Sequence, residues 1–166
     1  MLACLIDDRA KVTPAQMDKW CRDFDNWGIC DTACFALFDR SPHAWTKVRQ
    51  WSRRRGEYQR CAAFALLWGL TVHDKSAPDR RYLDGLARIR AAATDERRYV
   101  RMAVSMALRA TGKRNPALNR AALAVARRLA ESTDPSSRRT GKEALRELSS
   151  ASVQRRLRTR RAKSRP

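Results

Sequence analysis

The sequence lacks long apolar runs, regular cysteine spacing and a balance between its charges. No stretch approaches the roughly 18 apolar residues that a membrane span needs, so we expect no membrane partner. The apolar opening, residues 1–6, is followed at once by Asp7 and Asp8 and has no basic leader. It is too short for a signal peptide, and we therefore expect a cytoplasmic protein.

Cysteine occurs at positions 4, 21, 30, 34 and 61, an odd number that offers no paired disulfide framework. Cys30 and Cys34 share one helical face. Cys21 and His43 lie not far away in sequence, so a metal site is conceivable, but no CxxC or HxxxH spacing supports it. Buried thiols that pack as small hydrophobes are the alternative that we favour. We accordingly expect neither a metal ion nor another cofactor.

Acidic residues are scarce, with 17 Asp and Glu against 36 Arg and Lys and a formal net charge of +19. A pI near 11.2 implies a polyanionic partner, for which nucleic acid is the default and an anionic lipid surface the alternative. A hydrophobic fraction of 43% excludes wholesale disorder. At 166 residues the chain has the length of one domain with a sizeable core.

The sequence contains no convincing strand pattern, and nearly every segment reads as helix. Helix starts are marked by a capping residue before proline, as at Thr13-Pro14, Ser41-Pro42 and Asp134-Pro135. Asp25 or Asn26 is expected to cap the second helix. The expected helices cover about residues 14–24, 26–38, 42–51, 58–72, 79–89, 94–111, 116–130 and 135–148.

These helices are joined by short turns, which predicts antiparallel pairs that stack into a solenoid. Exact sequence repeats are not visible, so any repeat is structural and of the degenerate HEAT kind. The expected fold is all-α, a HEAT-like α-solenoid of stacked antiparallel helix pairs over residues 1–150. Residues 151–166 are almost purely basic, and we expect them to form a disordered tail that adds non-specific attraction to phosphate.

Trp27 and Asp31 are one helical turn apart, so the indole and the carboxylate project together. A basic protein that binds a polyanion has no electrostatic reason to place a carboxylate on its binding face. If Asp31 points there, it is expected to stabilise developing positive charge, such as arises at a sugar when its bond to a base breaks. The alternative is a core tryptophan beside a solvated or capping aspartate.

Two groups of basic residues are candidate phosphate contacts. Arg60 stands at the start of an apolar helix, where it either binds phosphate or pairs with an aspartate, Asp31 being one candidate. In the run of residues 97–101, Tyr99 is interleaved with Arg98 and Arg101. Such interleaving suits nucleic acid. Arg101 could equally be solvated, and Tyr99 could belong to the core.

A third basic group lies between two expected helices. Lys113 and Arg114 follow Gly112, which is expected to end the preceding helix. Such a turn suits a phosphate, although surface turns are often basic.

In series, these motifs resemble the AlkD-type DNA alkylation repair family. The resemblance covers residues 13–148 and is carried by D-F-D-N-W at 23–27 with Asp31, Y-Q-R-C-A at 58–62, A-V-S-M-A-L-R at 103–109 and G-K-R-N at 112–115. It implies a HEAT-like solenoid and a metal-free DNA glycosylase that releases positively charged N3- or N7-alkylated purines. We accordingly expect double-stranded DNA as the partner of a nucleoid-associated monomer.

The resemblance also implies roles for single residues. Trp27 matches a tryptophan that lines the lesion cleft, Asp31 matches the catalytic aspartate, and Arg60 matches an arginine that grips backbone phosphate. The chemistry agrees, because an alkylated purine is already a good leaving group. The enzyme then has to stabilise an oxocarbenium-like sugar and position water, for which a carboxylate is suited. Aromatic faces attract the cationic base.

The chain departs from the family at two points. Met106 stands where the family has a second cleft tryptophan, and the resemblance implies a chain shortened at the N-terminus. Both favour an alternative, a catalytically silent solenoid that binds DNA as a scaffold. A further alternative is a solenoid adaptor for RNA or an acidic protein. The direction of Asp31 discriminates: in an enzyme its carboxylate is free and faces the basic surface.

Overall fold

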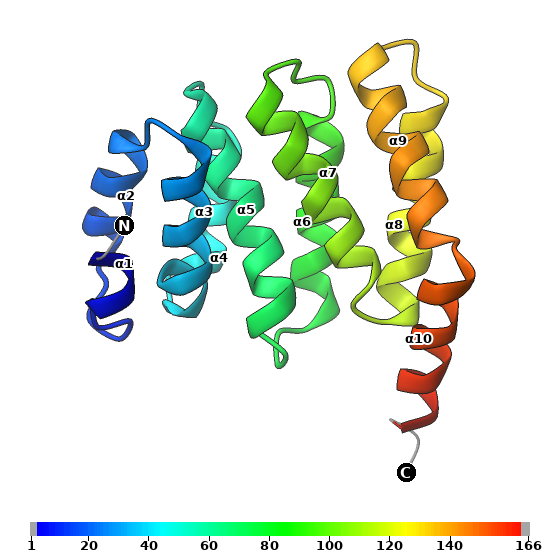
Figure 1. Ribbon diagram of the computed structural model, residues 1–166, viewed down its shortest axis with the longest axis horizontal. Helices are drawn as coiled ribbons and strands as arrows, with labels where there is room; N and C mark the ends of the chain where they lie inside the picture. The colour runs from blue at the N-terminus through cyan, green and yellow to red at the C-terminus, as the bar shows by residue number, and fades with distance from the viewer. Residues whose placement is uncertain (1–2, 164–166) are drawn as a thin grey trace.

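The structure is a computed structural model that describes residues 3–163 and is helical throughout, with no strand in that range. This confirms the expected all-α class. Figure 1 shows the helices side by side in chain order. Their bounds are α1 Ala3–Ile6, α2 Pro14–Asp23, α3 Trp27–Ala36, α4 Ala44–Trp51, α5 Glu57–His73, α6 Asp79–Ala92, α7 Arg98–Gly112, α8 Pro116–Ala130, α9 Pro135–Leu148 and α10 Ala151–Lys163, with a 3-10 turn η1 at Phe38–Arg40.

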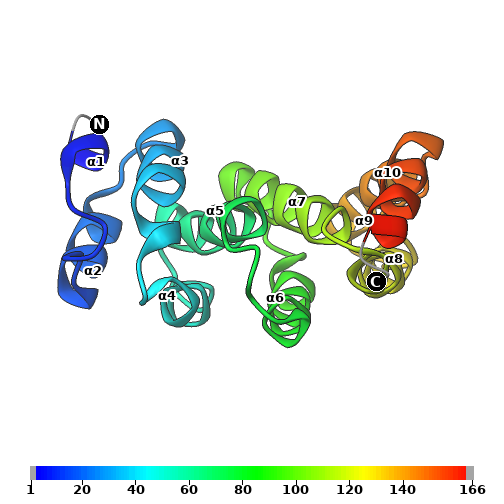
Figure 2. The ribbon, with the colours of Figure 1, turned by 90° about the horizontal axis from the view of Figure 1, so that it is seen from below.

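The helices form two rows, which is the arrangement of an α-solenoid. One row contains α1, α3, α5, α7 and α9, and the other contains α2, α4, α6 and α8 (Figure 2). The first row bends: in Figure 2, α3 at one end and the added helix α10 at the other lie farther from the second row than α5 and α7 do. The expected stacked-helix solenoid is therefore confirmed. None of the helices in the described range combines the length and apolarity needed to cross a membrane.

Capping residues define several helix starts, those at Thr13 and Asp134 as expected. Thr13, Asn115 and Asp134 each accept a hydrogen bond from the backbone N–H three residues on, at 3.1, 2.8 and 3.4 Å, and each precedes a proline. Asn26 rather than Asp25 caps α3, its Oδ1 accepting from the N–H of Ile29 at 3.0 Å. These four starts are set by residues adjacent in sequence. The expectation that Ser41-Pro42 opens a helix is wrong: α4 begins at Ala44, and Ser41 Oγ accepts instead from the N–H of His43, two residues on, at 3.2 Å.

The expectation that a helix opens at residue 94 is wrong, since α7 begins at Arg98. The reason is that the Asp95 carboxylate accepts hydrogen bonds from Arg60 and Arg97, at 2.9 and 2.6 Å. Glu57 of α5 takes over the capping role and accepts from the backbone N–H of Tyr99 at 3.1 Å. A side chain from a neighbouring helix therefore decides where α7 starts.

The core is centred on α5, which packs against α3 and α7 within its row and against α4 in the other row. Because α5 has neighbours on several sides, ten of its residues are buried, among them Phe64, Leu66 and Leu67. Each such large side chain contributes about 1.5–3 kcal/mol relative to exposure. This confirms the apolar segment 58–72 as the central helix.

Gly112 ends α7 as expected, but it does so without a left-handed conformation, because the glycines of the described chain have no positive φ. A Cβ at Gly112 would lie 2.6 Å from Cδ1 of Leu148 and 3.0 Å from Cβ of Ala122. Glycine is needed here because α8 and α9 pack closely against the end of α7.

The expectation of a disordered tail from residue 151 is wrong over Ala151–Lys163, which form α10. Val153 and Leu157, one turn apart, are buried at 6% and 4% exposure. Gln154 Nε2 donates to Asn119 Oδ1 at 3.1 Å and to the Leu148 carbonyl at 2.7 Å. Val153 and Leu157 thus give the basic segment one apolar face, with which it packs against α8 and α9. Residues 164–166 lie outside the described range.

Candidate functional site

The first row has a surface that is turned away from the second row, which we call the open face (Figure 2). Most of the sequence-predicted residues belong to helices of the first row, α3, α5 and α7. Two pockets mark the open face, and their linings come from α5, α7, α9 and α10 and from the connections that follow α5 and α7. The residues that define the open face below are Trp27, Asp31, Phe35, Trp68, Arg101, Met102, Met106, Arg109, Lys113, Arg139 and Arg156.

Trp27, Asp31 and Phe35 form one row along α3, since they are spaced four residues apart. Phe35 meets Trp68 of α5 edge-on, with ring centroids 4.6 Å apart, and Trp68 lines one of the two open-face pockets. The row therefore borders that face. Trp27 is 54% exposed, so the alternative of a core tryptophan is wrong.

The Asp31 carboxylate is half-buried between α3 and α5, next to the thiols of Cys30 and Cys61. Within residues 3–163 it accepts no hydrogen bond and joins no ion pair, which also excludes the capping alternative. Burial raises the pKa of the Asp31 carboxyl above its usual value. A desolvated acid without a partner is unfavourable for folding, and such groups are concentrated at functional sites.

Arg60 does not join this site. Its Nη1 donates to Asp95 Oδ2 at 2.9 Å, so the expected aspartate partner exists but is not Asp31. The hydrogen bond from Arg97 and the Arg60 charge hold the pKa of Asp95 below its usual range, although burial opposes them. Arg60 also borders a pocket that is lined by α6 and by the residues just after α4, which belong to the second row. The Arg60 guanidinium thus braces the α6–α7 connection, and its contact with backbone phosphate near the lesion stays a prediction.

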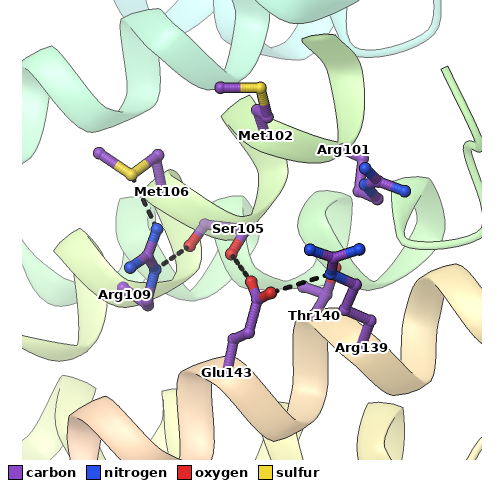
Figure 3. Close-up of a pocket in the computed structure, with 8 residues that line it drawn as sticks. All are labelled: Arg101, Met102, Ser105, Met106, Arg109, Arg139, Thr140 and Glu143. Atoms are coloured by element: carbon purple, nitrogen blue, oxygen red, sulfur yellow. Dashed lines mark hydrogen bonds and ion pairs between the residues drawn. The ribbon is translucent and has the colours of Figure 1, made fainter. Parts of the chain in front are cut away.

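Met106 and Arg101 lie together in the pocket between α7 and α9, of about 170 Å³ (Figure 3). Met106 Sδ accepts from Arg109 Nη2 at 2.8 Å. Arg109 Nη1 in turn donates to Glu147 at 2.7 Å. Arg101 makes no ion pair with any part of the chain that the structure describes, so its guanidinium is open to a ligand.

Lys113 lines the second open-face pocket, between α5, α7 and α10. It pairs with Glu147 at 2.6 Å. Burial by itself would raise the pKa of Glu147, but hydrogen bonds from Lys113 and Arg109 outweigh it and hold that pKa below its usual range. The single Glu147 carboxylate is thus shared by two basic residues of the open face.

Arg114 borders the same pocket, but its guanidinium is used in the fold. It donates to the carbonyls of Thr71, Lys75 and Ala77 in the α5–α6 connection. It also stacks over the Tyr82 ring at 4.4 Å. Arg114 therefore stabilises the junction of α5, α6 and α7.

Tyr99 stacks against Tyr58 of α5, with ring centroids 5.4 Å apart and a tilt of 31°. Both rings are half-buried, so Tyr99 belongs partly to the packing between α5 and α7. Arg98 is exposed and lies over the Tyr99 ring at 5.7 Å. Its charge remains available at the N-terminal end of α7.

Several residues of this surface were missed in the sequence. Arg139 of α9 and Arg156 of α10 line the two pockets, and Trp68 borders the second. Trp68 is hidden in an apolar helix, and Arg156 lies in a uniformly basic segment. No local spacing distinguishes them, because only the stacking of helices brings them to one face.

The metal site that the sequence made conceivable, with Cys21, Cys30, Cys34 and His43, is not assembled in the part of the chain that the structure describes. Among the described residues, the group with ligand atoms close enough for one ion consists of Cys30, Asp31 and Cys61. The open face combines two kinds of group. A lone carboxylate next to an exposed indole is suited to a cation, and the basic residues around them are suited to a polyanion.

Among the comparisons with known proteins, only the family comparison gives a match. No curated protein and no solved structure matches the chain. The model of the family described as "DNA alkylation repair enzyme" matches residues 1–148, nearly the whole solenoid. The chain belongs to the DNA alkylation repair enzyme family.

Proposed function

We propose that this protein is a DNA glycosylase that hydrolyses the N-glycosidic bond of N3- or N7-alkylated purines in double-stranded DNA, acting as a monomer at the nucleoid. The observation that carries the proposal is the desolvated, unpartnered Asp31 carboxylate beside the exposed Trp27. A carboxylate kept without a counter-charge in a protein of net charge +19 requires a cationic ligand to be useful.

The substrate supplies that cation. Alkylation at N3 or N7 places positive charge on the purine, and departure of the base transfers positive charge to the sugar. The Asp31 carboxylate stabilises this oxocarbenium-like sugar more strongly than the intact nucleotide, which is the condition for catalysis. Its partial burial strengthens the attraction, because screening by water is reduced. The carboxylate also accepts a hydrogen bond from the attacking water and acts as its base.

Trp27 presents an indole face to the same space. A cation against an aromatic face gains roughly 0.5–2 kcal/mol, so Trp27 favours an alkylated base over a neutral one. Arg101 of the open face and the exposed Arg98 at the start of α7 would hold the phosphates on either side of the lesion. Lys113, which shares Glu147 with Arg109, would have to exchange that ion pair for a phosphate. Arg114 and Arg60 are left out of this set because their guanidinium groups are bound within the fold.

Release of 7-methylguanine from duplex DNA tests the proposal. We expect the wild-type protein to liberate the free base in single-turnover reactions and Asp31→Asn to do so about 10²-fold more slowly or worse. Asp23→Asn is the matched control, because Asp23 is an exposed aspartate at the end of α2 and does not belong to the row of Trp27, Asp31 and Phe35 along α3. Equal losses in the two variants would remove Asp31 from the mechanism.

A catalytically silent DNA-binding scaffold is the second candidate, and the specific observation that favours it is Met106. A methionine whose sulfur accepts from Arg109 offers no aromatic face to a cationic base. In that case the protein binds duplex DNA with a steep salt dependence but releases no base. Binding and release measured on one preparation therefore separate the two functions.

A further inference from the structure

Three potential metal ligands meet at the junction of α3 and α5. The Sγ atoms of Cys30 and Cys61 and a carboxylate oxygen of Asp31 all lie within 4.8 Å of one another. Cys30 and Asp31 are adjacent in α3, whereas Cys61 comes from the first half of α5. The group therefore exists only because these two helices pack together.

The donor set suits a thiophilic cation. Zinc prefers four ligands in a tetrahedron, with Zn–S near 2.3 Å and Zn–O near 2.0–2.2 Å, so its ligand atoms stand roughly 3.5 Å apart. Separations of up to 4.8 Å therefore need shifts of about 1 Å, which χ1 rotations of short side chains can supply. Thiolates select soft or borderline ions over magnesium and calcium.

The surroundings fit the same role. No basic residue in the described part of the chain pairs with Asp31, so no positive charge competes with an incoming ion. Both thiols are buried, whereas the carboxylate is half-exposed, so an ion from the solvent reaches the group from the side of Asp31. Cys34 is nearby, but it is fully buried and its Sγ contacts the Ala62 carbonyl at 3.5 Å. A dry shell behind the ligands and one open side describe a site with a fourth position for water.

We propose that Cys30, Asp31 and Cys61 bind a thiophilic divalent cation such as Zn²⁺, and that the bound ion removes the Asp31 carboxylate from catalysis. The hydrated ion exchanges waters for two thiolates and one carboxylate oxygen and keeps one water. The two thiol protons pass to the solvent. The inhibitory part rests on the proposed glycosylase function, whereas binding of the ion does not.

Cobalt(II) is the probe for binding, because a thiolate ligand gives it a characteristic charge-transfer absorption. The full-length protein is titrated with Co²⁺ in the presence of a phosphine reductant that does not bind the metal. We expect the band to saturate at one equivalent, and excess Zn²⁺ to bleach it. In Cys61→Ala, binding should weaken about tenfold or more, since even loss of an outer-shell partner costs that much. Cys4→Ala, a buried cysteine of α1, should behave as wild type.

Asp31→Asn provides a second variant that tests the site without altering a buried thiol. It should keep the thiolate band but bind Co²⁺ more weakly. Absence of the band in folded wild-type protein, or an equal band in folded Cys61→Ala, would overturn the site. If Cys61→Ala does not fold, unchanged Co²⁺ affinity in Asp31→Asn overturns it.

Inhibition is measured on the release of 7-methylguanine, with Zn²⁺ added and then removed by a chelator. We expect Zn²⁺ to suppress release by wild type and Cys4→Ala, and the chelator to restore it. If Co²⁺ binds at the site but Zn²⁺ leaves excision unaffected, the inhibitory role is wrong. If wild type releases no base even without metal, the glycosylase proposal fails, and the cobalt spectrum still decides the metal site.

Discussion

Asp31→Asn is the substitution on which both catalysis and stability can be measured together. Asparagine keeps the size and hydrogen-bonding capacity of the side chain and removes its charge. In the described chain the Asp31 carboxylate has no partner to lose, and burial raises its pKa. The charged form is therefore less favourable in the folded state than in the unfolded chain. We expect the variant to be as stable as wild type or more stable.

The raised pKa of Asp31 also predicts how the stability difference between variant and wild type changes with pH. Since the folded pKa of Asp31 lies above the unfolded value, the folded protein binds more protons between the two values. Wild-type stability therefore falls as the pH rises through this interval, by about 1.4 kcal/mol for each unit by which the pKa is raised. The variant lacks this loss. The melting temperature of the variant should be equal to or lower than that of wild type in acid, and it should rise relative to wild type toward neutral pH.

In contrast to stability, the rate of base release should fall in Asp31→Asn. Removal of a preorganised electrostatic group costs about 10²–10³ in rate, or about 2.7–4 kcal/mol. Base release by wild type should rise with pH as the Asp31 carboxyl ionises, with a midpoint above the usual value, and the residual rate of the variant should lack this rise. Affinity for undamaged duplex should stay level or increase, since a charge that repels phosphate has gone.

Thermal melting and single-turnover base release on the same preparations are the assays. Early melting together with lost binding would refute the reasoning, because it would mean that the carboxylate is a structural partner of a cation. Full excision activity with unchanged melting would refute the catalytic role alone.

Three further substitutions test other parts of the structure. Asp95→Asn should destabilise the protein by about 3 kcal/mol, because Arg60 and Arg97 lose a carboxylate that is only 5% exposed. In wild type, the stability that this carboxylate contributes should be lost as the pH drops through the lowered pKa of Asp95. Urea unfolding measured against pH checks both expectations. Met106→Trp should raise base release about two- to thirtyfold through cation–π contact, and no gain in a folded variant would mean that Met106 does not face the lesion. Arg101→Ala should lower the slope of log affinity against log salt by about one, and an unchanged slope would show that Arg101 contacts no phosphate.

Local sequence is enough to predict most of the helices and the shared face of Trp27 and Asp31, although not the start of α7 or the helix α10. Helix starts at Thr13, Asn115 and Asp134 depend on residues within one turn, and such contacts form wherever the local sequence allows. The shared face of Trp27 and Asp31 follows from the helical period alone. Apolar periodicity and short turns then sufficed for the all-α solenoid. The resemblance to the alkylation repair family was likewise readable, because its motifs are short and local.

Which of the basic residues are available for a ligand depends on how the helices pack. Arg60 and Asp95 are far apart in sequence, and Arg114 reaches carbonyls of another connection, so no spacing rule pairs them. Val153 and Leu157 could not be recognised as a docking face until α8 and α9 were in place beside them. Cys61 stands beside Asp31 for the same reason. In each case the partner is supplied by a helix that the local sequence does not specify, and burial at the contact settles which of several possible partners is taken.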